Sequence, residues 1–446
     1  MEPLKILLAN MPFDGHFNPL VCVASSLKQA GHDVRWFTGS YYKEKVEQLS
    51  IPYYPFKKTV DYNQFNVDEV FPERLRYRNQ IKRLNWDLQH IFIRRAPELF
   101  EDIQEINNVF PFDVLIADVM FTCMPLVKAL LKKPALAIGV VPIIETSKDL
   151  PPAGLGMTPS YGFFGQLKQA FLRFLTDKVL LAGTHKMFRE ILNSKGIQTG
   201  NKNMFDILCQ HATLLLQSGV PGFEFKRADL GKNVRFIGAL IPSSKKSAPP
   251  EALFHKLKAF KKVILLTQGT IEKDPKKLII PTINAFRNSD HLVIVTTGGS
   301  KTLELKEKYP DANIVIEDFI PFEQIMPHAD VFVTNGGYGG VMLSVQHELP
   351  MIVAGIHEGK NEINARVGYF NLGINLQTEN PTAEKIKESI NKVLSSHDYK
   401  QNIKKLNLEF KNYDPNKLIL EYILQVTNER NSLEVKSACA ISSSNS

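Results

Sequence analysis

A glycine-dense turn and a histidine are the features of this 446-residue chain that could do chemistry. Four glycines fall within residues 336–340, between an apolar run at 329–333 and a helical segment that starts near Val341. Glycine lets the backbone approach an anion closely, and the free N–H groups at the start of a helix would point at that anion. Residues 335–340 therefore predict a phosphate or diphosphate site, with a flexible loop as the plainer alternative.

The histidine, His16, stands in the segment 12–19, which follows the apolar run at residues 5–9. In parallel α/β sheets, ligands bind at the carboxyl ends of the strands. Both the glycine turn and the histidine segment come after a predicted strand. The pattern therefore predicts a cleft with an anion site on one wall and a histidine on the other.

Short apolar runs that alternate with helical segments must position these two features. Such alternation is typical of a parallel sheet with helices on both faces, which places the chain in the α/β class. Two series occur, and they predict two Rossmann-like, doubly wound domains facing one another across a cleft. A helix is expected at residues 18–30. The predicted strands are residues 5–9, 33–37, 113–117 and 134–138 in the first series, and 262–267, 291–296, 313–316, 330–333 and 351–354 in the second.

A stretch rich in proline, serine and lysine separates the two series. We expect an N-terminal domain at residues 1–240, a linker at 241–252 and a C-terminal domain at 253–412. From residue 431 the chain is rich in serine and lacks periodicity. Residues 431–446 are therefore expected to form a disordered tail.

Charge, cysteine spacing and hydropathy indicate which classes of protein are not expected. The net charge is +8, but the basic residues are scattered, with a modest cluster at residues 256–262, so nucleic-acid binding is not expected. The four cysteines are widely spaced and form no C-x-x-C pair, so neither a disulfide framework nor a zinc site is indicated. No apolar run could span a bilayer, and the first residues lack the apolar region of a signal peptide. We expect a cytoplasmic protein with no transmembrane segment.

Several segments together resemble the UDP-glycosyltransferase superfamily, the inverting enzymes of the GT-B fold that glycosylate small lipophilic acceptors. The resemblance spans nearly the whole chain and is strongest to the bacterial branch that modifies natural products, including macrolides. It also implies that a helix at residues 413–430 packs back on the first domain. The segments that carry it are residues 15–20, Asp118, residues 233–238, 267–270 and 319–322, and the glycine turn with Leu349 and Pro350.

The resemblance assigns the catalytic roles to His16 and Asp118. His16 would be the general base that takes the proton of an acceptor hydroxyl, a role that suits an imidazole because histidine titrates near neutral pH. Asp118 would accept a hydrogen bond from the other ring nitrogen and stabilise the imidazolium that forms. The alternative is a loop histidine beside an aspartate that caps a strand end.

The resemblance also implies a binding site for a nucleotide-sugar donor. An aromatic ring would stack on uracil, backbone N–H groups of the glycine turn would hold the diphosphate, and a threonine would add its hydroxyl. The chain contains no Asp-x-Asp, so we expect no metal ion and no cofactor besides the UDP-sugar co-substrate. The donor-binding residues would be Gly15, Gly269, Thr270, Phe319, Ile320, Asn335, Gly337, Gly339, Gly340, Glu358 and Lys360.

Three positions depart from the pattern of the superfamily. Asn335 stands where most members have a histidine that contacts the phosphates, and Leu343 replaces a glutamate that accepts from the ribose hydroxyls. Gly359 and Lys360 fall where Asp-Gln normally contacts the sugar, and Glu358 is next to them as a substitute carboxylate. UDP-glucose is therefore a default assignment for the donor.

Aromatic residues of the first domain are candidates to line a pocket for a lipophilic acceptor, although many such rings simply pack in a core. The stretch at residues 163–174 has the spacing of an amphipathic helix, which could be a pocket wall or a face for a membrane surface. The acceptor candidates are Phe65, Phe71, Trp86, Phe121 and Phe163, followed by Phe92, Phe164, Phe171 and Phe174.

The resemblance, together with these features, implies a UDP-dependent hexosyltransferase that passes a sugar, by default glucose, to a hydroxyl of a phenolic, polyketide or macrolide acceptor with inversion. One alternative is a non-catalytic nucleotide-sugar-binding protein, which only Asn335 and Leu343 support. Another is a different enzyme of the same fold, such as a nucleotide-sugar epimerase or a lipid-linked sugar transferase.

Overall fold

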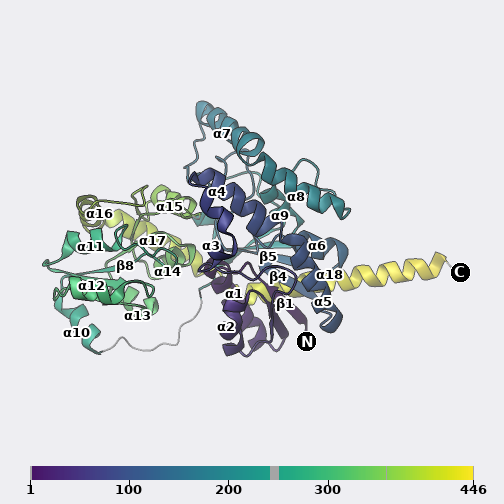
Figure 1. Ribbon diagram of the computed structural model, residues 1–446, viewed down its shortest axis with the longest axis horizontal. Helices are drawn as coiled ribbons and strands as arrows, with labels where there is room; N and C mark the ends of the chain where they lie inside the picture. The colour runs from purple at the N-terminus through teal and green to yellow at the C-terminus, as the bar shows by residue number, and fades with distance from the viewer. Residues whose placement is uncertain (1–2, 242–250, 358, 445–446) are drawn as a thin grey trace.

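The computed structural model describes residues 3–241, 251–357 and 359–444, which form two α/β domains (Figure 1). The first contains a seven-stranded parallel sheet in the order β3-β2-β1-β4-β5-β6-β7. Strands β1 and β4 are neighbours at its centre. The strands are β1 (Lys5–Ala9), β2 (Asp33–Phe37), β3 (Tyr53–Tyr54), β4 (Val114–Asp118), β5 (Ala135–Gly139), β6 (Leu214–Ser218) and β7 (Val234–Gly238).

The second domain contains a six-stranded parallel sheet in the order β10-β9-β8-β11-β12-β13. Its central strands β8 and β11 lead into the two segments that the sequence associates with the donor. The strands are β8 (Lys262–Thr267), β9 (His291–Thr296), β10 (Ile314–Glu317), β11 (Val331–Thr334), β12 (Met351–Val353) and β13 (Gly373–Asn375). The predicted pair of parallel α/β domains is confirmed.

Helices cover both faces of each sheet because alternate strand residues point to opposite sides. In β1, Leu7 and Ala9 pack in one buried cluster, whereas Ile6 and Leu8 pack in another. The helices are α1 (Asp14–Gln29), α2 (Lys43–Gln48), α3 (Val67–Val70), α4 (Gln80–Asp87), α5 (Ala96–Val109), α6 (Met124–Leu130), α7 (Phe163–Leu175), α8 (Ala182–Ser194) and α9 (Met204–His211) in the first domain, then α10 (Glu251–Ala259), α11 (Ile279–Phe286), α12 (Thr302–Lys308), α13 (Phe322–Ile325), α14 (Tyr338–Gln346), α15 (Lys360–Tyr369), α16 (Ala383–Ser395) and α17 (His397–Phe410).

The last helix, α18 (Pro415–Ser444), returns to the first domain (Figure 1). Its Ile419 and Ile423 are fully buried in the cluster that contains Leu8 and Phe17. The helix continues to Ser444, where the sequence indicated a disordered tail. Leucine, glutamate, lysine and alanine in this stretch favour a helix, whereas the expectation of disorder rested on its serines.

Two helix starts differ from those expected. Helix α1 begins at Asp14, so His16 lies in its first turn and not in a preceding loop. Helix α14 begins at Tyr338, which places Gly339 and Gly340 inside the first helical turn. Of the linker expected at residues 241–252, the stretch 242–250 lies outside the described residues.

The carboxyl end of the first sheet contacts the start of α14 in the second domain. The Tyr338 hydroxyl donates to the carbonyl oxygen of Ser218, which is the last residue of β6, at 2.6 Å. Burial holds the pKa of Tyr338 above its usual range, so the phenol stays a donor. Nearby, the buried Arg366 guanidinium donates to the Glu224 carboxylate of the first domain at 2.7 Å. The two strand edges that bear the candidate site therefore face each other.

Candidate active site

His16 and Asp118 form a hydrogen-bonded pair at the carboxyl edge of the first sheet. The Nδ1 atom of His16 lies 2.7 Å from Oδ1 of Asp118. The Asp118 carboxylate is fully buried, and the His16 side chain keeps 18% of its surface exposed. No residue that the structure describes hydrogen-bonds Nε2 of His16. The pair can therefore offer Nε2 to a substrate while the carboxylate holds the other ring nitrogen.

The neighbouring strands β1 and β4 bring the two residues together. Asp118 is the last residue of β4, and the chain after β1 turns within a few residues into α1, which carries His16. Backbone N–H groups of Met11 and Met120 donate to the Asp118 carboxylate at 2.8 Å and 2.9 Å. These two bonds and the bond to His16 fix the buried carboxylate in one orientation.

Two half-buried aromatic rings, those of Phe13 and Phe92, lie next to His16. The centroid of the Phe13 ring lies 5.9 Å from that of His16, and the centroid of Phe92 lies 6.4 Å from it. The Phe92 carbonyl oxygen accepts from Thr122 Oγ1 at 2.7 Å, which ties the helical segment that carries this ring to the turn after β4. Phe13 was not among the acceptor candidates from the sequence. Its position three residues before His16 in the chain could have indicated that its ring lies near the histidine.

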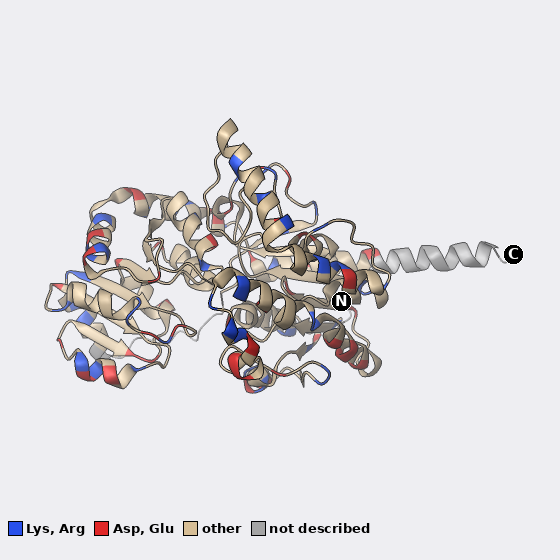
Figure 2. Ribbon diagram, turned by 45° about the horizontal axis from the view of Figure 1, so that its top comes forward, with Lys and Arg blue, Asp and Glu red and all other residues tan. Residues whose placement is uncertain are grey.

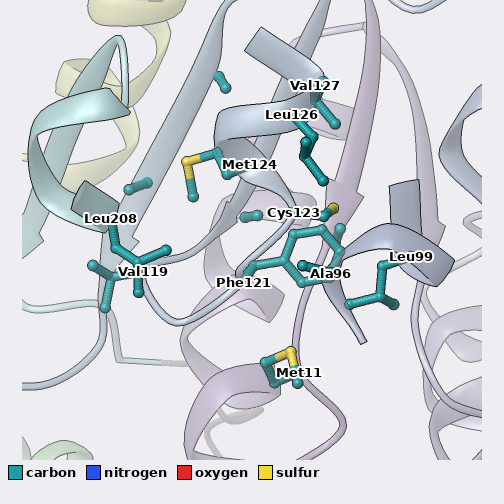
Figure 3. Packing of buried hydrophobic residues seen from close by; sticks show 14 of the residues in the cluster. Met11, Ala96, Leu99, Val119, Phe121, Cys123, Met124, Leu126, Val127 and Leu208 are labelled. Carbon is teal, nitrogen blue, oxygen red and sulfur yellow. The ribbon is translucent and has the colours of Figure 1, made fainter. Parts of the chain in front are cut away.

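The acceptor candidates lie in different environments. Phe121 is fully buried, and Figure 3 shows its ring among the core side chains Met11, Ala96, Leu99 and Cys123. Its expected role in the pocket is therefore wrong, because the turn after β4 directs the ring into the core.

Trp86 is also buried in that core, stacked on His90 with ring centroids 4.3 Å apart, so it too is a core residue and not a pocket residue. Phe71 packs edge-on against Tyr62 and Trp86 at the margin of the same cluster. Phe65 lies at the contact between domains, where Lys273 Nζ is 5.4 Å from the centroid of its ring. Phe92 is thus the one candidate with a ring contact to His16.

Phe163, Phe164, Phe171 and Phe174 lie on α7 with their side chains largely exposed. Figure 1 shows α7 projecting away from the rest of the first domain. This placement separates these four rings from Phe92, the candidate that contacts His16.

The glycine turn forms the opposite wall. Gly337 is the N-cap of α14 and has no side-chain cap, and a Cβ atom at Gly337 or at Gly339 would meet no other group within 4 Å. The first N–H groups of α14 are thus available to an anion. Gly336 has φ +89°, and a Cβ atom there would come 1.8 Å from Oδ1 of Asn364, so the turn requires glycine at this position.

Two side-chain amides hold this wall together: that of Asn335, a predicted donor residue, and that of the buried Asn364, which the sequence reading did not single out. Asn364 Nδ2 donates to the carbonyl oxygens of Gly355 at 2.9 Å and Asn335 at 3.2 Å, which joins the loops after β12 and β11. The side chain of Asn335 donates in turn to the carbonyl oxygen of Gln268, after β8. Asn364 lies inside α15, where neither its helical position nor its type signals this role.

The two walls approach each other at Thr270. Its hydroxyl donates to Oδ2 of Asp14 at 3.3 Å, across the boundary between the domains. Gly15, exposed and next to Asp14 in α1, borders the same place. Gly269 has φ +74° and its Cα faces the side chain of Asn335. The predicted histidine and anion segments are thus brought to one site.

The remaining donor candidates lie around this wall. Phe319 is 69% exposed and lies beside Gly299, so its ring is open to a stacking partner, and Ile320 follows it half-buried. Glu358 lies outside the described residues. Leu343, at the position of the usual ribose-binding glutamate, is buried in the core of the second domain.

A polar recess lies beside Asn335 and Lys360, lined also by Lys277, Glu272 and Glu379. Lys277 Nζ donates to Glu379 at 3.2 Å and to Glu272. Burial alone would raise the pKa of Glu379, but donation from the Ile356 N–H and from Lys277 leaves the pKa below its usual range. The recess therefore holds an ionised carboxylate where the hydroxyls of a sugar could donate.

Comparison with known proteins shows the family of this chain. Residues 281–417 match the family model of the erythromycin biosynthesis protein CIII-like C-terminal domain. A protein from Lentzea aerocolonigenes named 4'-demethylrebeccamycin synthase is 32% identical over 406 residues, which cover 91% of this chain and 95% of that protein. The chain belongs to the UDP-glycosyltransferase superfamily. UDP-glycosyltransferase 2 of Phaeomoniella chlamydospora is 28% identical, with 92% of each protein covered.

Solved structures give the fold of this glycosyltransferase. The calicheamicin glycosyltransferase CalG4 superposes with a TM-score of 0.72 at 17% identity, covering 96% of this chain and 99% of that one. The kitacinnamycin enzyme gives a TM-score of 0.74 at 15% identity, covering 95% and 99%. The two parallel-sheet domains are therefore those of the GT-B fold. Among the described residues, no helix of this glycosyltransferase has the length and apolar character to cross a membrane.

Proposed function

We propose that this glycosyltransferase moves a sugar, by default glucose, from a UDP-sugar to a hydroxyl of a lipophilic small molecule, with inversion at the anomeric carbon. The observation that carries the proposal is the His16–Asp118 pair at 2.7 Å, which stands opposite the open helix start at Gly337. A base and an anion site on facing strand edges are what a single displacement with a diphosphate leaving group requires.

The proposed reaction is one in-line step. Nε2 of His16 takes the proton of the acceptor hydroxyl while its oxygen attacks the anomeric carbon, and the bond from that carbon to the β-phosphate oxygen breaks. Asp118 keeps Nδ1 protonated and stabilises the imidazolium that forms. Charge develops on the departing UDP, where the N–H groups of Gly339 and Gly340 and the hydroxyl of Thr270 would bind it most strongly.

Residues of the second domain support the assignment of a UDP-sugar as the donor. Exposed Phe319 would stack on uracil, and Ile320 would offer its backbone to the base edge. Lys360 and Glu379 border the recess beside the glycine turn and would meet the phosphates and the sugar. We propose that transfer needs no metal ion, since the N–H groups of α14 and the cation of Lys360 can supply the positive field.

The proposed acceptor is an apolar natural product of the phenolic, polyketide or macrolide type. Phe13 and Phe92 present apolar surface at His16, which suits a ring-containing alcohol or phenol. The name of the relative from Lentzea aerocolonigenes, 4'-demethylrebeccamycin synthase, points to the same chemical class.

Ligand-dependent melting of the purified protein with UDP, dTDP, GDP and their sugar conjugates tests the donor. A large rise in melting temperature with the uridine compounds is expected. With the donor identified, His16→Ala should lower turnover of weakly acidic alcohols by about two to four orders of magnitude and leave UDP affinity nearly unchanged. A protein that binds UDP-sugar but turns over no acceptor in the wild type would be a non-catalytic binder. Isomerised donor without any acceptor would indicate an epimerase.

A further inference from the structure

Helix α7 exposes most of its large apolar side chains, and the one side chain of the helix that is buried, Gln169, is polar. Five large apolar side chains are between 60% and 83% exposed: Phe163, Phe164, Leu167, Phe171 and Phe174. Positions 163, 167, 171 and 174 recur at spacings of three and four and form one stripe on a helix, with position 164 at its border. A stripe of this size on a soluble domain marks an interaction surface.

The opposite face of α7 is fixed to the protein by polar contacts. Gln169 is buried, and its Oε1 accepts from the Ser160 N–H at 2.7 Å while its Nε2 donates to the Asp149 carbonyl oxygen at 3.2 Å. Arg173 donates to the Leu150 carbonyl oxygen on the same side. These contacts fix the rotation of α7 about its own axis. The apolar stripe on the other side of the helix therefore faces away from the protein.

The charges near the stripe are basic. Lys168 and Lys178 are exposed along the same segment, and α7 itself contains no aspartate or glutamate, as Figure 2 shows for this projecting helix. The acidic residues close to α7 have partners in the protein: Asp149 accepts from the Ala228 N–H at 2.7 Å, Asp229 accepts from the Lys148 N–H at 2.8 Å, and Asp177 lies 3.5 Å from Nε2 of His185. An apolar stripe bordered by lysines is complementary to an anionic lipid surface.

We propose that α7 binds the surface of an anionic lipid bilayer. The 13-residue helix is too short to span the membrane and would lie in the interface, with its five apolar side chains at the acyl boundary and its lysines at the headgroups. The convex, projecting position of α7 leaves it free to reach a flat surface (Figure 1). A two-fold pairing of α7 with a second copy would instead bring lysines of like charge together. This inference stands independently of the proposed reaction.

Co-sedimentation of the full chain with phosphatidylcholine vesicles, with and without about one third phosphatidylglycerol, tests the proposal. We expect binding to the anionic vesicles that falls at high salt. The double variant Phe164→Glu/Phe171→Glu should lose about tenfold or more of this binding. Leu303→Glu is the control, since it places a single glutamate at an apolar residue that is 76% exposed on α12, and it should bind as the wild type does.

Reversal of the lysine charges supplies a second, milder perturbation if the double variant fails to fold. Lys168→Glu should weaken binding to anionic vesicles by roughly fivefold. A wild-type protein that stays in the supernatant would overturn the proposal, as would variants that sediment like the wild type. A dimer that the double variant converts to monomers would assign the stripe to a second copy. Loss of turnover of a water-soluble acceptor with unchanged vesicle binding would assign it to the acceptor pocket.

Discussion

Replacing Asp118 with asparagine tests the proposed base without changing the size of the side chain. In the native protein, Oδ1 of Asp118 accepts from His16 Nδ1 at 2.7 Å and from the Met120 N–H at 2.9 Å. Oδ2 accepts from the Met11 N–H at 2.8 Å. All three partners are donors when the histidine is ready to act as a base. An asparagine must therefore direct its NH₂ group at a donor in either of its two orientations.

The expected losses of stability and of turnover follow from these two orientations. With the NH₂ group toward Met11, one buried hydrogen bond is lost, which costs about 1–3 kcal/mol of stability. With the NH₂ group toward His16, Nδ1 must accept, the ring proton moves to Nε2, and the imidazole can no longer take a proton from the acceptor. In both cases the negative charge beside the imidazolium is gone. We expect kcat to fall by about 10²–10⁴ for Asp118→Asn.

The assay compares two acceptors of different acidity. With a weakly acidic alcohol we expect this whole fall in kcat, whereas a nitrophenol that is already ionised needs no base and should keep most of the wild-type rate. Asp102→Asn is the matched control, because Asp102 is equally buried and accepts from the N–H groups of Lys57 and Lys58, each at 3.0 Å. It should lower stability but leave turnover intact. Equal losses with both acceptors, or wild-type turnover in a folded Asp118→Asn protein, would refute the reasoning.

Three further perturbations test the second domain and its contact with the first. Gly336→Ala should abolish the UDP-dependent rise in melting temperature, because the added Cβ would collide with Asn364, and calorimetric UDP titration would measure the loss. Arg366→Met leaves the Glu224 carboxylate buried without its partner and should cost about 3–5 kcal/mol of stability in chemical denaturation. Because the folded-state pKa of Glu379 is lowered, its contribution to stability is present above the unfolded pKa of about 4.3 and is lost as the pH falls through the folded value. The stability difference between wild type and Glu379→Gln should therefore be present at pH 7 and vanish at strongly acidic pH.

The strands could be predicted from the sequence because buried parallel strands are continuous apolar runs. The expected strands at residues 5–9, 33–37, 262–267 and 291–296 coincide with β1, β2, β8 and β9. The start of α1 could not be predicted in the same way. Gly15 and Pro19 are poor helix formers and indicated a loop around His16, but contacts of α1 with the sheet and with α18 override that local preference.

The candidate site could be predicted only where residue type itself signals the chemistry. The glycine turn and His16 stood out for that reason. The amide of Asn364 did not, because its role depends on two carbonyl oxygens that the fold brings to it from separate loops. The aromatic candidates show the same limit, since Phe121 and Phe92 look alike in the sequence and only packing sends one ring into the core and the other toward His16.

The anomeric configuration of the product tests the central claim most directly. NMR of the glycoside formed from an α-linked UDP-sugar would report it from the coupling of the anomeric proton. One in-line displacement with His16 as the only base predicts a β-linked product. An α-linked product would require a second displacement or a front-side attack and would contradict the single-step mechanism.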